Sequence, residues 1–280
     1  MGEKVKGFLI IIGGAEDRKG ECKILKKFIN ISGGKDARIT VITAAAQDPQ
    51  QVGAEYIEIF SELGAHDVQA LNIESRKEAD REEIADRILD STGIFFTGGD
   101  QLRITSLLGG TRVYNALHRA YREGVIVAGT SAGASAMSDT MIIGGSGDQA
   151  PKGSTVSMAP GLGLLEEVVV DQHFAQRGRM SRLLLAVAQN PYILGVGIDE
   201  DTAILVSPDG KFRVIGSNTV TVVDGSIVDF TNVSELESGE PLAMFNAKIH
   251  ILSPGFGFDM KNRKPLKGEA TGTYIRSGNG

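Results

Sequence analysis

The chain has 280 residues and a net charge of −6, with 41% hydrophobic and 23% charged residues. This ordinary globular composition predicts a sizeable buried core and excludes wholesale disorder. The acidic balance, without any long basic block, excludes the electrostatic footprint that nucleic-acid binding requires. We expect a single α/β domain over residues 1–260.

The first half of the sequence alternates short apolar runs with longer helical patterns. The apolar runs predict strands at 8–12, 39–43, 68–71, 93–97 and 125–128. The helical patterns predict helices at 23–31, 52–63, 78–89 and 101–122. This βαβ order is typical of a doubly wound, mostly parallel sheet with helices on both faces.

Short β-like runs dominate the second half. A helix is expected at 180–189, and strands are expected at 168–170, 195–198, 203–206, 212–215 and 219–223. We assign these strands to the far edge of the sheet and to appended antiparallel strands. From about residue 261 the sequence is polar and glycine-rich, which predicts a flexible tail over 261–280.

The cellular environment is indicated by two features. Cys22 is the single cysteine, which excludes an intrachain disulfide and favours a reducing compartment. The first apolar stretch, 8–12, is too short for a signal-peptide core or a membrane span. We therefore expect a cytoplasmic protein with no membrane partner.

The clearest chemical signal is Gly129-Thr130-Ser131-Ala132-Gly133, directly after an apolar run. Small residues two before and two after a serine permit the strained turn of a nucleophile elbow. We predict Ser131 as a nucleophile at the C-terminal edge of the sheet, with the positive end of a helix beneath it. A purely structural turn is the alternative.

A serine nucleophile needs a base that takes its proton. His173 follows the apolar run 168–170, at the same kind of strand end as Ser131, and we predict it as that base. The other three histidines fit structural positions: His66 lies in a surface loop, His118 on a helix surface and His250 within a strand.

The sequence defines the acid that would orient the histidine, and the oxyanion hole, less precisely than the serine. Asp199, Glu200 and Asp201 follow another strand, and the pattern does not choose among them; a solvated turn is the alternative. For the oxyanion hole we expect the backbone N–H of Ala132 and one near Gly99, where the main chain can approach a substrate. The loop that contains Gly99 can also cap the next helix.

The chain order of serine, histidine and acid differs from that of the α/β-hydrolases, chymotrypsin and subtilisin. The sequence instead resembles peptidase family S51, which contains the cyanophycinases and the aspartyl dipeptidases and has a fold similar to class I glutamine amidotransferase domains. The resemblance covers nearly the whole chain, with its motifs at 13–17, 96–101, 129–134, 171–174 and 197–203. It assigns the nucleophile to Ser131, the base to His173 and the acid to Glu200.

The resemblance also implies a substrate and a binding groove. Members of the cyanophycinase branch hydrolyse cyanophycin, a polyaspartate with arginine on each β-carboxyl, to β-Asp-Arg dipeptides. No cofactor or metal is implied, and a homodimer is expected. The groove residues carried over are Gln101, Asp171, Gln172, Arg177, Arg179 and Arg182. Asp171 could bind a guanidinium of the substrate, and the arginines could clamp aspartyl carboxylates.

The arginines also fit the solvated start of the helix at 180–189. Arg179 and Arg182 then share a face at i,i+3, whereas Arg177 does not. Cations at a helix N-terminus oppose the helix dipole, so an anionic group is expected nearby.

Two other functions stay open. One is an isoaspartyl or acidic dipeptidase, although the arginine-rich stretch and the C-terminal extension favour cleavage of a polymer. The other is a non-catalytic binding protein with an amidotransferase-like fold. A nucleotide site at 13–16 is disfavoured because the G-x-G-x-x-G spacing is missing, and no His-x-x-x-His or paired cysteines indicate zinc.

Overall fold

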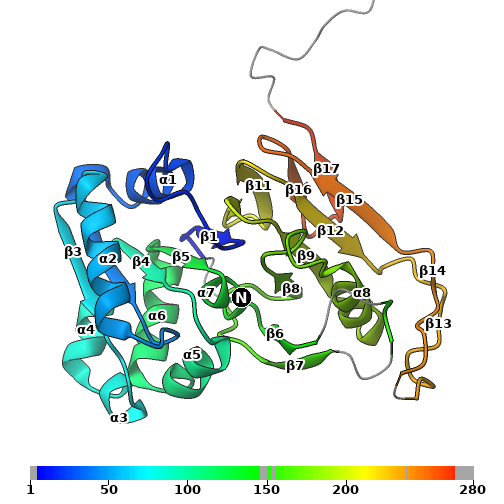
Figure 1. The fold of residues 1–280 in the computed structure, drawn as a ribbon. Helices are drawn as coiled ribbons and strands as arrows, with labels where there is room; N and C mark the ends of the chain where they lie inside the picture. Colours follow the sequence, from blue (N-terminus) through cyan, green and yellow to red (C-terminus); the bar gives the residue numbers. More distant parts are fainter. Residues whose placement is uncertain (1–4, 146–149, 153–155, 238, 269–280) are drawn as a thin grey trace, which may run out of the picture.

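The computed structural model describes residues 5–145, 150–152, 156–237 and 239–268. Its largest sheet has nine strands, and five of them are parallel neighbours (Figure 1). In spatial order the parallel strands are β1 (Leu9–Ile12), β5 (Ile126–Thr130), β4 (Gly93–Phe96), β2 (Arg38–Ile42) and β3 (Asp67–Leu71). Antiparallel strands continue the sheet beyond β1 in the order β10 (Thr202–Val206), β11 (Lys211–Gly216), β16 (Gly257–Asp259) and β17 (Lys264–Leu266).

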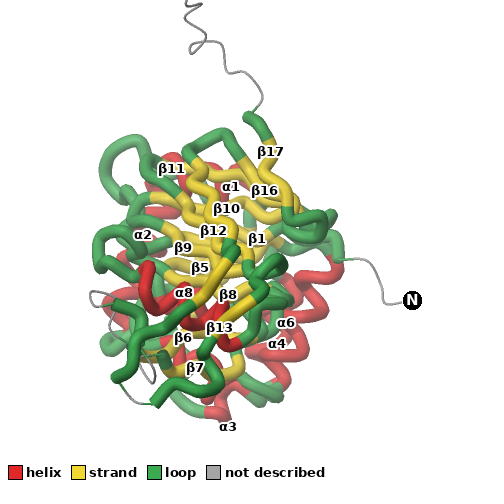
Figure 2. Tube along the Cα trace, turned by 90° about the vertical axis from the view of Figure 1, so that its right-hand side faces the viewer, coloured by secondary structure: helices red, strands yellow, loops and turns green. Residues whose placement is uncertain are grey.

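Helices cover both faces of the parallel strands (Figure 2). Ile10 and Ile12 of β1 pack on one face with α1 (Lys23–Ile31) and α2 (Pro49–Glu62). Leu9 and Ile11 point the other way because successive strand side chains alternate. They share a core with α3 (Arg76–Ala79), α4 (Glu82–Asp90), α5 (Gln101–Leu108) and α6 (Arg112–Glu123). The structure confirms the predicted fold class.

A second sheet lies beside the first, in the order β15 (Lys248–Leu252), β12 (Val220–Asp224), β9 (Leu194–Ile198) and β8 (Val168–Asp171). One of its faces packs against α8 (Met180–Gln189). Its other face, which includes Val170 and Val196, joins the same buried cluster as Ile204 of β10. The two sheets therefore share one hydrophobic core. Two smaller sheets have two strands each: β6 (Thr140–Gly144) pairs with β7 (Ser157–Pro160), and β13 (Phe230–Thr231) pairs with β14 (Met244–Phe245).

Several boundaries differ from the sequence-based expectations. The helix expected at 78–89 is divided into α3 and α4, and the one expected at 101–122 is divided into α5 and α6. The second division falls at Gly109 and Gly110, since Gly110 has φ 75° and Thr111 then caps α6. Part of the predicted tail is ordered, because β17 pairs with β16. The remainder of that tail, 269–280, lies outside the described residues.

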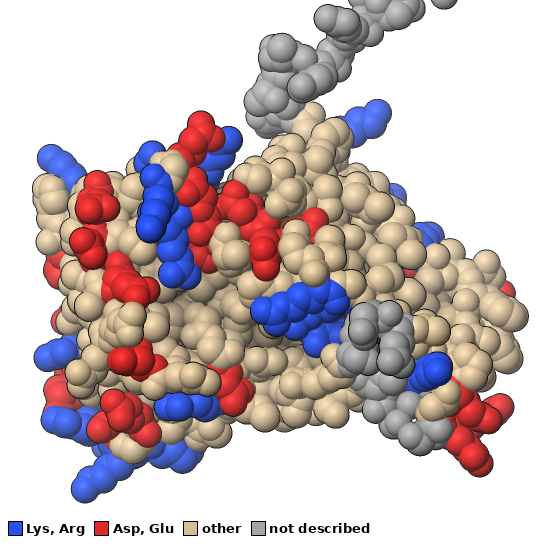
Figure 3. All heavy atoms as spheres, in the orientation of Figure 1, with Lys and Arg blue, Asp and Glu red and all other residues tan. Residues whose placement is uncertain are grey.

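Charges of both signs are mixed over the helical side of the face shown in Figure 3, and the part over β12 and β15 is largely uncharged. None of the helices in the described ranges is long and apolar enough to cross a membrane.

Candidate active site

Ser131 lies between β5 and α7 (Ala132–Ser135) in a strained turn, with φ 54° and ψ −112°. The turn brings the main chain so close together that a Cβ on Gly129 would lie 2.6 Å from the Gly133 carbonyl oxygen. A Cβ on Gly133 would lie equally close to the oxygen of Phe96. Both glycines are therefore required by close packing around the serine. The helix expected beneath Ser131 is only one turn long, so its dipole is small.

A chain of hydrogen bonds leads from this serine through His173 to Glu200. The Oγ of Ser131 lies 3.0 Å from Nε2 of His173, and Nδ1 of His173 lies 2.7 Å from Oε1 of Glu200. His173 follows β8, and Glu200 lies in the turn between β9 and β10. With the Nδ1 proton donated to the carboxylate, Nε2 is free to accept the serine proton. The arrangement can therefore activate a serine hydroxyl.

The two aspartates beside Glu200 are engaged elsewhere. Asp199 is buried and accepts hydrogen bonds from the backbone of Ala175 and from both the backbone and the hydroxyl of Thr219. Asp201 accepts from the backbone N–H of Asp17 and from a serine hydroxyl. Of the three carboxylates, only that of Glu200 lies against the imidazole.

The pKa of His173 is lowered from its ordinary value of 6.5. Burial, which penalises the imidazolium form, is the largest cause, while the hydrogen bond to Glu200 opposes the shift. The positive charges of Arg177 and Arg179 lower the pKa further. His173 is therefore neutral at pH 7, as a general base must be.

The two segments expected to form an oxyanion hole both lie against Ser131. Ala132 follows it directly and is fully buried. A Cβ on Gly98 would lie 3.4 Å from Cβ of Ser131, so the loop after β4 passes beside the nucleophile. Gly99 has φ 140°, and a side chain there would meet the Ala45 carbonyl oxygen at 2.0 Å. The Asp100 carboxylate caps α5 by accepting a hydrogen bond from the N–H of Leu102. The loop therefore also has the helix-capping role expected from the sequence.

Four of the six residues carried over as groove residues, Asp171, Gln172, Arg179 and Arg182, form one largely buried cluster. Asp171 is 1% exposed, and Arg182 binds both of its oxygens. Arg179 contacts the same carboxylate at 3.4 Å and also donates to the side chain and the backbone of Gln172. Asp171 is thus the anionic group that was expected near the arginines at the start of α8. The guanidinium groups that contact it are those of Arg179 and Arg182 of the same chain.

The other two groove residues are Arg177 and Gln101. Arg177 is exposed. The amide of Gln101, at the start of α5, donates to the Ile142 carbonyl at 2.8 Å and so links α5 to β6.

Burial lowers the pKa of Arg179 to about 10, which leaves this side chain protonated at neutral pH.

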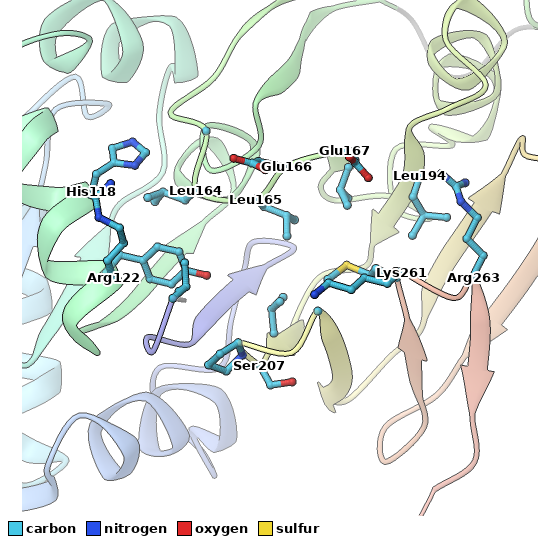
Figure 4. Close-up of a pocket in the computed structure, with 18 residues that line it drawn as sticks. His118, Arg122, Leu164, Leu165, Glu166, Glu167, Leu194, Ser207, Lys261 and Arg263 are labelled. Atoms are coloured by element: carbon cyan, nitrogen blue, oxygen red, sulfur yellow. The ribbon is translucent and has the colours of Figure 1, made fainter. Parts of the chain in front are cut away.

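The three remaining histidines are not part of this arrangement. His66 is exposed, and the ring of His250 packs beside that of Phe258. His118 binds the Leu162 carbonyl and lines a cavity of about 540 Å³ (Figure 4). This cavity includes Val206, which pairs with Leu9 at the start of β1, whereas the serine follows the strand end that pairs with Ile12. The cavity therefore lies at the opposite end of the sheet from Ser131.

Within the ranges that the structure describes, no group of three or more His, Cys, Asp or Glu side chains could hold a metal ion. The structure also reveals a buried acid beside Ser131 to which the sequence analysis gave no role. Glu16 is 4% exposed and accepts a hydrogen bond of 2.5 Å from the hydroxyl of Thr130, the residue before the nucleophile. The available signal was the glycine-rich turn after the first strand, because such turns bring polar side chains to the sheet edge.

Comparison with known proteins identifies relatives along nearly the whole chain. The sequence model of peptidase family S51 matches residues 9–215. A cyanophycinase from Geminocystis herdmanii (strain PCC 6308) is 40% identical over 269 residues, covering 96% of this chain and 99% of the relative. One from Synechococcus elongatus is 42% identical over 260 residues, with 92% and 81% covered. One from Trichormus variabilis (strain ATCC 29413 / PCC 7937) is 42% identical over 265 residues, with 94% and 89% covered.

Solved structures share the fold at low sequence identity. The crystal structure of a peptidase from an acI-B1 Actinobacterium has a TM-score of 0.62 at 21% identity and covers 90% of this chain and 98% of that one. A putative peptidase E from Listeria monocytogenes EGD-e has a TM-score of 0.51 at 16% identity, with 75% and 98% covered. At these identities the likeness concerns the fold alone. Because the family model spans most of the sequence and the curated relatives align along nearly all of it, this chain is a peptidase and belongs to peptidase family S51.

Proposed function

We propose that this peptidase hydrolyses cyanophycin through Ser131, His173 and Glu200 and releases β-Asp-Arg dipeptides. The observation that carries the proposal is the continuous hydrogen-bonded path from the strained serine through the histidine to the glutamate. The substrate is inferred from relatives at 40–42% identity that bear the name cyanophycinase.

In the proposed first step, Ser131 Oγ attacks the backbone carbonyl carbon of an aspartyl unit of the polymer while Nε2 of His173 takes its proton. The imidazolium then gives this proton to the departing amine, which leaves an ester on the serine. Glu200 holds the imidazole in the tautomer that can accept and stabilises its charged form. Water, deprotonated by the same histidine, hydrolyses the ester and restores the serine.

The negative charge that develops on the carbonyl oxygen needs preformed donors. We assign the backbone N–H groups of Ala132 and Gly99 to this task, since their segments flank the nucleophile. Substrate binding is assigned to Gln101, Gln172, Arg177, Arg179 and Arg182. The positive charges of the arginines suit carboxylate groups of the substrate. Asp171 has both oxygens bound to Arg182, so its contribution is to hold Arg179 and Arg182 in place.

The test is incubation of the purified protein with insoluble cyanophycin, followed by mass spectrometry of the soluble fraction for β-Asp-Arg. We expect release by the wild type and by Ser106→Ala, a change of an exposed serine on α5, and none by Ser131→Ala. A serine-directed phosphonate should modify the wild type at Ser131 alone.

The alternatives give different results in the same assay. Cleavage of β-aspartyl dipeptides without release from the polymer would indicate the dipeptidase activity instead. Absence of both hydrolysis and labelling in the folded wild type would reject a serine hydrolase and favour a binding protein.

We also propose that the protein is a cytoplasmic homodimer. The single cysteine suits a reducing compartment. Light scattering of the purified protein should give twice the chain mass of 29.7 kDa, and a value near one chain mass would contradict the dimer.

A further inference from the structure

The turn that follows β1, residues 12–17, contacts each of the three segments that carry the candidate triad. Three consecutive carbonyl groups on this turn accept backbone hydrogen bonds. Ile12 accepts from Ser131 at 3.1 Å, Gly13 accepts from His173 at 2.7 Å, and Gly14 accepts from Asp201, beside Glu200, at 2.9 Å. Segments that are far apart in the sequence are thus aligned on one short stretch of main chain.

The three donors share an unfavourable backbone conformation. Ser131, His173 and Asp201 have φ values of 54°, 46° and 47°. Residues with a side chain adopt positive φ only where the surrounding structure holds them there. The β1 turn supplies one such restraint to each of them. It also approaches the histidine ring closely, because a Cβ on Gly14 would lie 2.4 Å from Nε2 of His173.

Glu16 is the residue of this turn whose side chain reaches the nucleophile segment. One carboxylate oxygen accepts the Thr130 hydroxyl at 2.5 Å, and the other accepts from Tyr56 at 2.6 Å and from Arg18 at 3.0 Å. Arg18 also donates to the Tyr56 hydroxyl and lies over its ring. The Glu16 side chain is fully buried, and all its partners are donors. This network fixes the residue that precedes Ser131 relative to α2.

We propose that Glu16 is a positioning residue for the nucleophile, acting through the Thr130 hydroxyl while the turn carbonyls hold the histidine and acid segments. The proposal rests on the proposed function, since it concerns the same serine and histidine. Glu16 does not touch the reacting atoms. Its loss should therefore lower the reactivity of Ser131 without weakening substrate binding.

The structure offers a matched set of variants. Glu16→Gln keeps the volume but places an NH2 donor against groups that themselves donate. Thr130→Val removes the hydroxyl at nearly constant shape, and Thr130→Ser restores it. Asp224→Asn removes another buried carboxylate, which lies at the end of β12 in the second sheet and pairs with Arg263, and serves as the control for a purely structural effect.

Kinetic constants for a β-aspartyl substrate and the phosphonate labelling rate provide the first readout. We expect Glu16→Gln and Thr130→Val to lower kcat and the labelling rate about 10- to 100-fold, because small displacements of a nucleophile cost that much. KM should stay within about twofold of the wild-type value, Thr130→Ser should recover most of the rate, and the double variant should be no slower than the worse single one. Asp224→Asn should lower the melting temperature without changing these rates.

A second readout does not depend on catalysis. Nitrogen NMR of histidine-labelled protein reports the hydrogen bond at Nε2 of His173, and this signal should change in Glu16→Gln and remain in Asp224→Asn. If Glu16→Gln loses stability but keeps wild-type rates and the wild-type signal, the positioning role is wrong. If the NMR change occurs while the wild type hydrolyses nothing, the positioning role is supported and the proposed function is the one that fails.

Discussion

His173 combines two opposing influences on its protonation. Burial and the charge of Arg177 lower its pKa below 6.5, and the hydrogen bond to Glu200 raises it. A base must be neutral to take a proton, so activity should fall as the pH drops through this pKa. We expect the acid limb of kcat/KM to lie below pH 6.5 in the wild type. Arg177→Gln removes a neighbouring cation and should move that limb to higher pH.

The pH dependence of kcat/KM for a soluble β-aspartyl peptide measures this shift. Arg87→Gln is the control, because Arg87 is exposed on α4 and is not among the groups that shift the pKa of His173. A limb that moves to lower pH in Arg177→Gln, or that moves equally in both variants, would refute the assignment.

Asp171 and Asp209 provide a comparison of buried and exposed ion pairs. Asp171 is 1% exposed and holds Arg182, whereas Asp209 pairs with Lys211 on the surface. Asp171→Asn should reduce the free energy of unfolding by about 3 kcal/mol, because it leaves a buried guanidinium without its counter-ion. Asp209→Asn should cost less than about 1 kcal/mol. Urea unfolding measures the free energy of unfolding of each variant. Equal losses in the two variants would show that burial of the ion pair does not determine its contribution to stability.

At the scale of the element, α6 ends on a glycine that its geometry requires. Gly124 has φ 118°, and its N–H bonds to the Ala120 carbonyl at 3.1 Å. Gly124→Ala should lower the free energy of unfolding by about 1–2 kcal/mol, since a side chain disfavours this conformation. Gly144→Ala is the control, because Gly144 lies in β6 without a positive φ, and a Cβ there would make only an ordinary contact of 3.7 Å with Cβ of Ser157. It should change stability by less than about 0.5 kcal/mol, and a similar loss in both variants would contradict the conformational argument.

The remaining element boundaries show where local patterns are sufficient. The bounds of α1 and α8 were predicted to the residue, because each has one apolar stripe that is buried on a sheet. The runs at 78–89 and 101–122 have a continuous helical pattern as well, yet each forms two helices. The helical spacing of apolar residues continues across a short break between two helices. Periodicity alone therefore does not detect a turn in which the chain changes direction.

At the scale of the whole molecule, the two ends of the central sheet differ in chemistry. Ser131, the proposed nucleophile, follows the C-terminal end of β5 in this sheet, and the cavity lined by His118 (Figure 4) lies at the other end. We therefore expect His118→Gln to leave kcat/KM within about twofold of the wild type, while His173→Gln lowers it by about 10³-fold or more. Hydrolysis assays on both variants measure this. A large loss in His118→Gln would place chemistry, or a coupled site, at the cavity.

The sequence by itself determined the alternation of strands and helices, the elbow at Ser131 and the strand end that precedes His173. These follow from hydrophobic period and from small residues around a turn, which are properties of neighbouring positions. The residues alone left the choice among Asp199, Glu200 and Asp201 open, and family resemblance supplied it. In the structure, the direction of each carboxylate is set by partners such as Thr219 and Ser217.

Only the tertiary structure decided which side chains meet. Sheet order brings the β1 turn beside three distant segments, so Glu16 reaches Thr130 although nothing in the local sequence links them. It also turns Asp171 toward Arg182 of the same chain. Pairing between distant side chains depends on strand order and on burial, and neither is encoded in the period of a short segment.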